Sequence, residues 1–351
     1  MSIPAVSVIM AAYNGAAWLP ATLESLSAQT FGDWEAIVVD DCSTDETRHL
    51  VARWSDRRVR LVALERNGGP VRARNRAAAE ARGRYLAALD QDDVCRPERF
   101  ARQVAWLDAH PHAAALGTAV EFMTASGQVR PSGYPPTTTP GLIDWLLGIE
   151  NPLVWSSMMI RADAARRLDP FTRPEQLYAE DCDLYHRLRP CGTIARLDEP
   201  LLLYRQHEAQ ASQRFTDTMQ ASAARVLAAR HAEWLGEGAA RAANLLVRHV
   251  MARLPVPDRA TLAELGALIG RLQAHHLDAH DPDPQTRALI RWETSRRWAR
   301  IGRAALRSGA LTLADVLAVR PPHLGLGHAG LETLMVSGLV GGGRRLARRR
   351  A

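Results

Sequence analysis

The sequence predicts an α/β fold, in which a mostly parallel β-sheet is flanked by helices, followed by an α-helical C-terminal region. Two observations support this prediction. In the first half of the chain, short apolar runs alternate with amphipathic segments, which is the pattern of a repeated βα unit. Beyond about residue 216, alanine, arginine and leucine recur at helical spacing. With 351 residues and 47% hydrophobic content, the chain can bury a large core, and we expect domains at 1–215 and 216–351.

Four segments are too continuously apolar to leave one face in water, and we expect them to form a parallel sheet: 6–13, 34–41, 59–65 and 85–90. Parallel strands need right-handed crossover connections, so helices should lie between them and cover both faces of the sheet. The second of these helices is expected to begin at Ser43, with Glu46 closing a capping box.

The segment from 111 to 215 is more mixed and is expected to form the other half of the same domain. Strand-like runs at 113–123, 151–160 and 200–207 surround a helix predicted around 180–188. The helical segments after 216 carry no recognisable catalytic motif, so packing or oligomer contacts are the favoured interpretation.

Charge and cysteine content set the expected location. The formal net charge of +6 is carried by arginine, since the sequence contains no lysine. The C-terminal run "GGGRRLARRRA" could contact anionic lipid, although a solvated tail is the more common role of such a run. No C-x-x-C pair and no secretory leader are present, and no apolar run reaches the roughly 18 residues that span a bilayer. We therefore expect a cytoplasmic protein without a membrane span.

Polar residues fall where the predicted strands end, and in such sheets ligands bind at the carboxyl ends of the strands. They follow the first, second and fourth strands: Tyr13 and Asn14, then Asp40 and Asp41, then Asp90, Gln91, Asp92 and Asp93. We expect these residues to share one site.

The acidic stretch after the fourth strand suggests a cation site. Asp90 and Asp92 are two residues apart and point to the same side if the chain stays extended. Mg²⁺ or Mn²⁺ is typically held by one or two carboxylates together with substrate phosphates, so the pair suggests a nucleoside-diphosphate site. The alternative is a solvated acidic turn, in which Asp93 caps a helix that starts near Pro97.

The segment "RNGGPVRARN" suggests a place for phosphate. Its glycines allow close approach of the backbone, and Arg72, Arg74 and Asn75 follow at a helix start, where anions are favoured. For either arginine taken alone, a solvated position on the helix surface is an equally good interpretation. Asp41 can accept hydrogen bonds from a base or a ribose, or can cap a helix.

A second acidic group begins the helix predicted around 180–188. Glu180, Asp181 and Asp183 are favoured there by the helix dipole alone. Leu184 and Leu188 should be buried, which leaves Glu180 and Asp181 to reach the sheet edge, where one of them could act as a general base.

Taken together, "VSVIMAAYNG", "NGGPVRARN", "YLAALDQDD", "NPLVWSS", "AEDCDLYHRL" and "YRQH" resemble the motifs of family 2 glycosyltransferases with the GT-A fold, over roughly residues 4–212. The resemblance implies an inverting enzyme that uses a nucleotide-diphosphate sugar, most often a UDP-sugar, with Mg²⁺ or Mn²⁺. It implies these roles: Tyr13 and Asp41 hold the nucleoside, Asp90 and Asp92 meet ribose and metal, Asp181 is the base, and His207 lies near the diphosphate and joins Asp92 at the metal.

On the same resemblance we assign Ala11, Asn14, Arg74, Asn75 and Gln91 to the donor site, and Glu180 to the catalytic pair. Two departures stand out. Ala11 and Ala12 replace the usual Pro-Thr, which removes a hydroxyl that could reach the base. Trp155 replaces a common histidine, and an exposed tryptophan there could stack on an acceptor sugar.

The resulting hypothesis is sugar transfer to a hydroxyl of a saccharide or lipid-linked acceptor, as in cell-envelope polysaccharide biosynthesis. The hypothesis includes peripheral contact of the arginine-rich tail with the inner face of the cell membrane. No nucleic-acid partner is expected. One alternative is a degenerate domain that binds nucleotide or polysaccharide as a scaffold. The other is a sugar-nucleotide oxidoreductase. The turn "YNGAAW" argues against it, because it lacks the G-x-G-x-x-G pattern of dinucleotide-binding folds.

Overall fold

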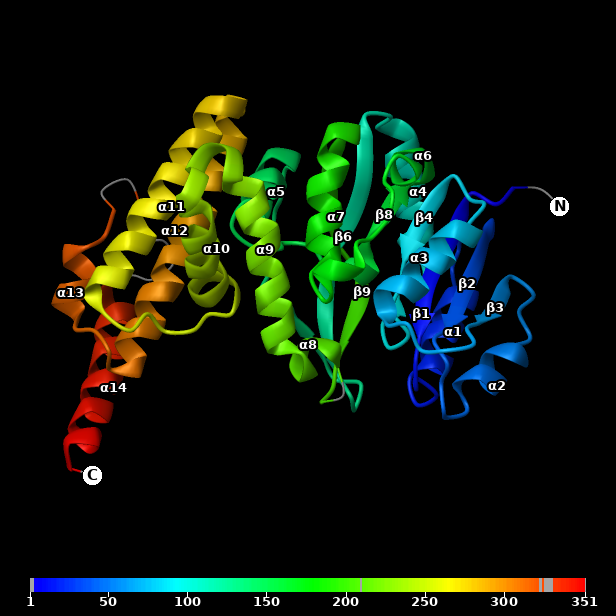
Figure 1. Ribbon diagram of the computed structural model, residues 1–351, viewed down its shortest axis with the longest axis horizontal. Coiled ribbons are helices and arrows are strands. Elements are labelled where there is room, and N and C mark those ends of the chain that lie inside the picture. Colours follow the sequence, from blue (N-terminus) through cyan, green and yellow to red (C-terminus); the bar gives the residue numbers. More distant parts are fainter. Residues whose placement is uncertain (1–2, 209, 322–323, 325–330, 351) are drawn as a thin grey trace. The chain divides into compact units, whose positions relative to one another are not determined.

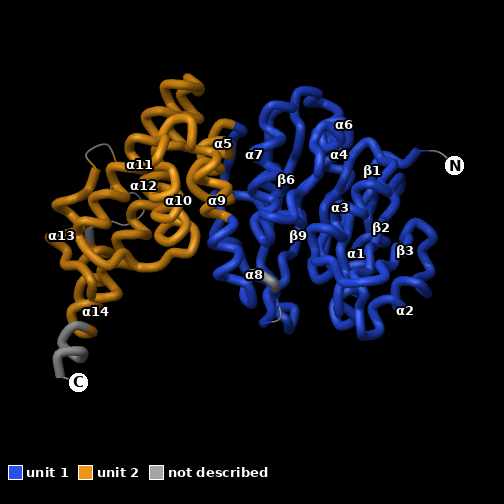
Figure 2. Tube along the Cα trace, viewed as in Figure 1, with its two compact units in different colours: residues 1–140, 152–222 blue, residues 141–151, 223–351 orange. Residues whose placement is uncertain are grey.

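The computed structural model describes residues 3–208, 210–321, 324 and 331–350, and of residues 211–212, 331 and 345–350 only the backbone. The described chain forms two compact units, which are shown in different colours in Figure 2. Unit 1 contains residues 1–140 and 152–222, and unit 2 contains 141–151 and 223–351.

Unit 1 is built on one sheet, whose strands follow the order β3-β2-β1-β4-β8-β6-β9-β5, with β7 paired to β6 (Figure 1). The strands are β1 (Val6–Ala12), β2 (Trp34–Asp40), β3 (Val59–Ala63), β4 (Tyr85–Ala88), β5 (Val94–Cys95), β6 (Ala113–Thr124), β7 (Val129–Pro131), β8 (Met159–Arg161) and β9 (Thr193–Gln206). The expected α/β fold class is confirmed.

The first four strands are parallel, as predicted, and the second half of the sheet is joined to them differently. β1 pairs in parallel with both β2 and β4, and β2 with β3. The short strand β8 lies antiparallel between β4 and β6, while β6 and β9 are again parallel. Every residue of β2 is buried, in keeping with the continuous apolar run 36–39 at its centre. The carboxyl ends of β1, β2 and β4 therefore lie at the same edge of the sheet.

Helices connect the strands of unit 1: α1 (Leu19–Ser27), α2 (Thr47–Ala52), α3 (Pro70–Glu80), α4 (Arg99–Ala109), α6 (Ala162–Arg166), α7 (Glu180–Leu188) and α8 (Ala211–Arg214). α3 packs on β1 and β2, and α4 on β6 and β9. The capping box predicted at Ser43 is wrong, because α2 begins at Thr47. The Ser43 hydroxyl accepts a hydrogen bond from the Asn14 amide instead, at 3.0 Å.

Unit 2 is helical in the part that the structure describes. It contains α5 (Pro140–Leu147), α10 (Ala239–Leu246), α11 (Arg259–His280), α12 (Pro284–Ser308), α13 (Leu313–Ala318) and α14 (Leu331–Arg350), and α9 (Thr216–Leu235) enters it. α14 packs closely on α12, since a Cβ added at Gly341 would lie 1.8 Å from the Leu306 carbonyl oxygen. None of the described helices is long and apolar enough to cross a membrane.

The division between the units differs in two respects from the expected domains. The first unit ends at 222, seven residues beyond the expected end at 215. Residues 141–151, which we expected in the first domain, belong to unit 2. Their apolar side chains, among them Leu142, Ile143 and Trp145, are buried in that unit, where the Trp145 indole donates to Thr294 of α12.

Candidate functional site

The acidic stretch predicted after the fourth strand follows β4 directly. The Asp90 amide donates to the Ser156 hydroxyl at 3.1 Å, which fixes the backbone at the start of the stretch. Asp90 and Asp92 are partly exposed, whereas Asp93 is buried. Asp90 and Asp92 of the D-x-D pattern thus keep partial access to solvent, whereas Asp93 is turned inward.

The expected helix-capping role of Asp93 is wrong. α4 begins at Arg99, with Glu98 at its N-cap. The Asp93 carboxylate instead accepts a hydrogen bond from the Arg205 amide of β9 at 2.9 Å. Burial, and then the nearby carboxylates of Asp92 and Asp90, raise the pKa of Asp93 well above its ordinary value. The acids at this strand end repel one another, which favours a cation beside them.

Arg74 joins three segments of the chain. From the second turn of α3, its guanidinium donates to Asp90 at 2.8 Å and forms an ion pair with Glu180 at the start of α7. All three side chains are largely buried, with exposed fractions of 13% for Arg74, 28% for Asp90 and 4% for Glu180. Burial lowers the pKa of Arg74 and the facing carboxylates raise it, and the net effect is a raised pKa. Arg74 therefore stays charged and bound to both acids.

The two acids at the start of α7 have different surroundings. Glu180 is buried and paired with Arg74 through Oε1, while its Oε2 has no hydrogen-bond partner among the described residues. Asp181 is only partly buried, and its Oδ1 accepts from the Cys182 amide at 2.8 Å. Of the pair, Asp181 is the one whose carboxylate reaches solvent.

Gln91 clamps the turn after β1. Its side-chain amide accepts from the Tyr13 backbone N–H at 2.9 Å and donates to the Tyr13 carbonyl at 3.1 Å. A Cβ added at Gly15 would lie 2.1 Å from the Gln91 Oε1, so glycine is required for this close approach. The Tyr13 ring is 47% exposed beside this fixed backbone. The structure thus brings Tyr13 and Gln91 together, with the tyrosine ring accessible to a ligand.

Three other residues assigned to the donor site hold backbone segments in the structure. Asn14 accepts from the Thr44 amide at 2.8 Å. Asn75 accepts from the Thr172 amide at 2.9 Å and donates to its carbonyl at 2.7 Å. The Asp41 carboxylate accepts from the amides of Gly68 and Gly69 at 2.7 and 2.8 Å. Each therefore fixes a loop around the site, and their contact with a nucleotide stays a prediction.

Ala11 lies near the end of β1, paired with Val39 of β2, and is partly buried. Its methyl group offers no hydrogen bond, so any contact with a ligand there is apolar or through the backbone.

His207 lies against Asp92, the other residue assigned to the metal, and their role as metal ligands stays a prediction. Its Nε2 is 2.8 Å from Asp92 Oδ2, and the imidazole stacks on Trp18 with ring centres 5.0 Å apart. The guanidinium carbon of Arg205 lies over the same indole, 4.8 Å from its ring centre. The Arg205 Nε also donates a hydrogen bond to the Asp92 backbone carbonyl at 2.8 Å. Trp18 and Arg205 were missed by the sequence analysis. Trp18 lies between β1 and α1, outside the strand ends considered, and in "YRQH" only His207 was singled out.

The expectation of an exposed Trp155 is wrong. Trp155 is 6% exposed, with the Arg74 guanidinium 5.1 Å from its ring centre and Phe171 beside it at 6.4 Å. A buried indole under a guanidinium supports the Arg74 ion pairs through a cation–π contact and cannot stack on an acceptor sugar.

The residues at this edge fit a hard divalent cation. Asp90 and Asp92 supply carboxylate oxygens, and the His207 imidazole lies beside Asp92. Mg²⁺ and Mn²⁺ prefer such oxygen ligands and accept water and phosphate oxygens in the remaining positions.

The comparisons with known proteins identify the family. Glycosyl transferase family 2 matches residues 7–169. The amylovoran biosynthesis glycosyltransferase AmsE of Erwinia amylovora is 30% identical over 186 residues, which are 52% of this chain and 68% of AmsE. This chain belongs to glycosyl transferase family 2.

Other relatives match over shorter shares of their length. The succinoglycan biosynthesis protein ExoO of Rhizobium meliloti is 49% identical over 107 residues, which are 30% of this chain and 31% of ExoO. The putative glycosyltransferase EpsE of Bacillus subtilis is 33% identical over 193 residues, which are 52% of this chain and 66% of EpsE.

Among solved structures, S. aureus TarS 1-349 in complex with UDP-GlcNAc is similar, with a TM-score of 0.53 and 19% identity. The match covers 97% of this chain and 92% of that chain. It shows a shared fold, and the GT-A fold expected for this family member is confirmed.

Replacing Arg74 by lysine keeps the positive charge but removes the planar fork that reaches two acids. We expect the free energy of unfolding to fall by about 2–3 kcal/mol, the scale of a lost hydrogen bond to a charged group. The matched control is Arg76→Lys on the same helix, where the arginine pairs with Glu80 on the surface and the change should stay below about 1 kcal/mol. Urea unfolding of both variants measures the difference, and equal small losses would contradict the bridging role of Arg74.

Proposed function

We propose that this family 2 member transfers a sugar from a nucleoside-diphosphate donor, with UDP as the nucleotide, to a hydroxyl of a saccharide or lipid-linked acceptor, with inversion at the anomeric carbon. The observation that carries the proposal is the convergence of Asp90, Asp92, His207 and the Arg74–Glu180 pair at one edge of the sheet. This arrangement offers a cation site beside a possible base.

The names of relatives support the choice of donor and acceptor. The protein WfgD of Escherichia coli, named as a UDP-Glc:alpha-D-GlcNAc-diphosphoundecaprenol beta-1,3-glucosyltransferase, is 38% identical over 102 residues, which are 29% of this chain and 40% of WfgD. AmsE and ExoO are named for the biosynthesis of polysaccharides. A role in cell-envelope polysaccharide biosynthesis is part of our proposal.

The proposed metal ligands are Asp92 and His207, with Asp90 contacting the ribose. A divalent cation bound there supplies charge neutralisation for the departing diphosphate. PcManGT of Pyrobaculum calidifontis, solved with GDP-Man and Mn²⁺, has a TM-score of 0.51 and 19% identity, and the match covers 97% of this chain and 88% of that chain. We therefore propose Mg²⁺ or Mn²⁺ as the cofactor.

The proposed general base is Asp181. Its partly exposed carboxylate begins α7, while Glu180 next to it is buried against Arg74. In this scheme Asp181 accepts the proton of the acceptor hydroxyl as its oxygen attacks the anomeric carbon, and the bond from that carbon to the diphosphate oxygen breaks.

A screen of nucleotide sugars tests the function, because a donor that binds the native state raises the melting temperature by mass action. With Mn²⁺ present, one UDP-sugar is expected to raise it, and the Asp92→Asn variant should lose the part of the shift that needs metal. The control Asp163→Asn alters an exposed aspartate that accepts from the Ala164 amide, and should keep the full shift. A chain that responds to no nucleotide sugar would support the scaffold alternative, and hydride transfer would support the oxidoreductase alternative.

Changing Asp181 to asparagine keeps the shape of the side chain and removes the proton acceptor. We expect kcat to fall by roughly 100-fold or more, the usual contribution of a positioned general base. Donor affinity should change little, because the lost interaction belongs to the transition state. Turnover and donor dissociation constants of Asp181→Asn are compared with those of Glu180→Gln, which should mainly lose stability. An active Asp181→Asn beside an inactive Glu180→Gln would assign the base to Glu180.

We also propose that α14 contacts an anionic lipid surface. The helix carries four exposed apolar residues, of which Leu339 is 77% exposed: Met335, Val336, Leu339 and Val340. The last three follow Met335 by one, four and five residues, a spacing that places all four on one face of a helix. Arg344 follows, and the sequence continues with Arg345 and three more arginines whose side chains lie outside the described residues. An apolar helix face followed by basic residues suits the boundary between anionic headgroups and acyl chains.

Binding to vesicles tests the role of α14. Truncation after residue 343 and the double change Met335→Ser with Leu339→Ser should each weaken binding to phosphatidylglycerol-containing vesicles, the truncation by about 1 kcal/mol per arginine removed. Added salt should weaken binding of the full chain. Leu254→Ser, a change at another exposed leucine, should have no effect. Unchanged binding in both α14 variants would overturn the proposal.

A further inference from the structure

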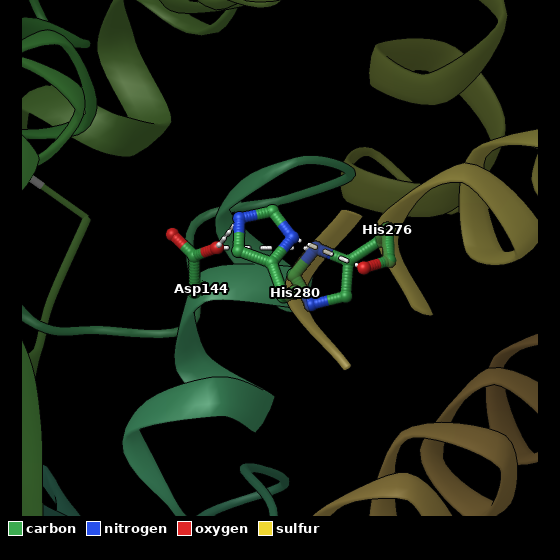
Figure 3. Close-up of side chains that lie close together, drawn as sticks. All are labelled: Asp144, His276 and His280. Carbon is green, nitrogen blue, oxygen red and sulfur yellow. Dashed lines mark hydrogen bonds and ion pairs between the residues drawn. The ribbon is translucent and has the colours of Figure 1, made fainter. Parts of the chain in front are cut away.

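Unit 2 contains a cluster of metal-ligating side chains that the proposed transfer reaction does not use. Asp144 lies on α5, and His276 and His280 lie four residues apart on α11 (Figure 3). Asp144 Oδ2 is 3.8 Å from His276 Nδ1 and 3.6 Å from His280 Nε2. One potential ligand atom from each of the three residues lies within 4.8 Å of the other two. Two helices that are far apart in the sequence thus point three ligand side chains at one spot.

The hydrogen bond of His280 decides which of its nitrogens can bind a cation. Its Nδ1 is 3.0 Å from the His276 carbonyl oxygen, which can only accept, so Nδ1 carries the hydrogen. In the neutral imidazole the lone pair is then on Nε2, the atom that faces Asp144. A histidine whose Nδ1–H is held by a backbone carbonyl while Nε2 is free of hydrogen has the arrangement of a metal ligand.

A divalent ion placed between these atoms would bind the Nε2 lone pair of His280 and a carboxylate oxygen of Asp144 at the same time. The His276 Nδ1, which is 3.8 Å from the same carboxylate oxygen, is the third ligand atom within reach of it.

We propose that Asp144, His276 and His280 form a binding site for a divalent transition-metal ion, with Zn²⁺ as the ion that best matches the ligands. Two imidazole nitrogens and one carboxylate oxygen are a common zinc ligand set, and a water molecule completes the tetrahedral coordination. Mg²⁺ and Ca²⁺ prefer mostly oxygen ligands and are poorer matches for a site with two imidazoles and one carboxylate. The site is separate from the Asp90 and Asp92 carboxylates, which belong to unit 1.

The surroundings allow the ion to enter and the ligands to adjust. The His280 side chain is 43% exposed and gives access from solvent, whereas His276 is 8% exposed beside Trp145. The ring planes are 25° apart, so a shared ion requires an imidazole to turn about χ2, a soft torsion. Binding would tie α5 to α11. Because α5 is an insertion between two parts of unit 1, the ion would fix this insertion within unit 2.

Binding of Co²⁺ and Zn²⁺ to the full-length, metal-free chain tests the proposal. Co²⁺ in a site with two imidazoles should give visible absorption bands that Zn²⁺ abolishes in competition. These bands should persist in Asp92→Asn, which removes a proposed ligand in unit 1. Asp144→Asn and His280→Ala should abolish the bands and weaken Zn²⁺ binding by more than the roughly 10–100-fold that loss of an outer-shell partner costs.

The control is His275→Ala, which removes a neighbouring histidine that stacks on Trp234 and lies outside the cluster. It should keep the bands and the Zn²⁺ affinity of the unaltered chain. Circular dichroism and melting temperature of the metal-free variants check that each one folds, and Asp144→Asn is nearly isosteric. Equal Zn²⁺ affinity in the unaltered chain, Asp144→Asn and His280→Ala would overturn the proposal, as would loss of the bands in Asp92→Asn alone.

Discussion

The Arg74 guanidinium is the interaction on which the site depends. It binds Asp90, 16 residues later in the chain, and Glu180, 106 residues later, in a place where all three side chains are largely buried. A buried charge without a partner is costly, so none of the three groups can leave without destabilising the others. Trp155 covers the guanidinium from one side and excludes water from the pairs. The ends of β4, α3 and α7 are thereby held in one fixed arrangement before any substrate binds.

The fold was largely predictable because its signals are local. Continuous apolar runs predicted β1 to β4 within two residues at each end, since strands buried on both faces have no polar alternation. The insertion of 141–151 into unit 2 could not be predicted in this way. An apolar helix such as α5 indicates that it will be buried, but its sequence does not say against which partner. The helix start of α2 was misplaced because Ser43 bonds to the turn after β1 rather than to its own helix.

The sequence predicted which residues come together at the candidate site, but it did not predict what each side chain contacts there. Strand ends and the order of the motifs pointed correctly to one edge of the sheet. Position alone could not separate side chains that face a ligand from those that hold the backbone, because asparagine, glutamine and aspartate serve both purposes. Gln91 and Asn75 satisfy backbone groups of Tyr13 and Thr172, and Asp93 satisfies Arg205. Trp155 illustrates the same difficulty, since a tryptophan in a site motif can be a surface platform or a buried support.

The distribution of charge explains why a cation would matter more at this site than a further arginine. Arg74 is already shared between Asp90 and Glu180, and the Arg205 Nε donates to the Asp92 carbonyl. Asp92 is paired with His207, and Asp93 accepts a hydrogen bond from the Arg205 backbone amide. Burial and the carboxylates of Asp92 and Asp90 raise the pKa of Asp93. A diphosphate entering such a field would be repelled, because like charges at close range disfavour one another. In the proposed reaction, a divalent ion on Asp92 would reverse the local sign of the charge, and the carboxylates that repel an anion would then hold the diphosphate through the metal.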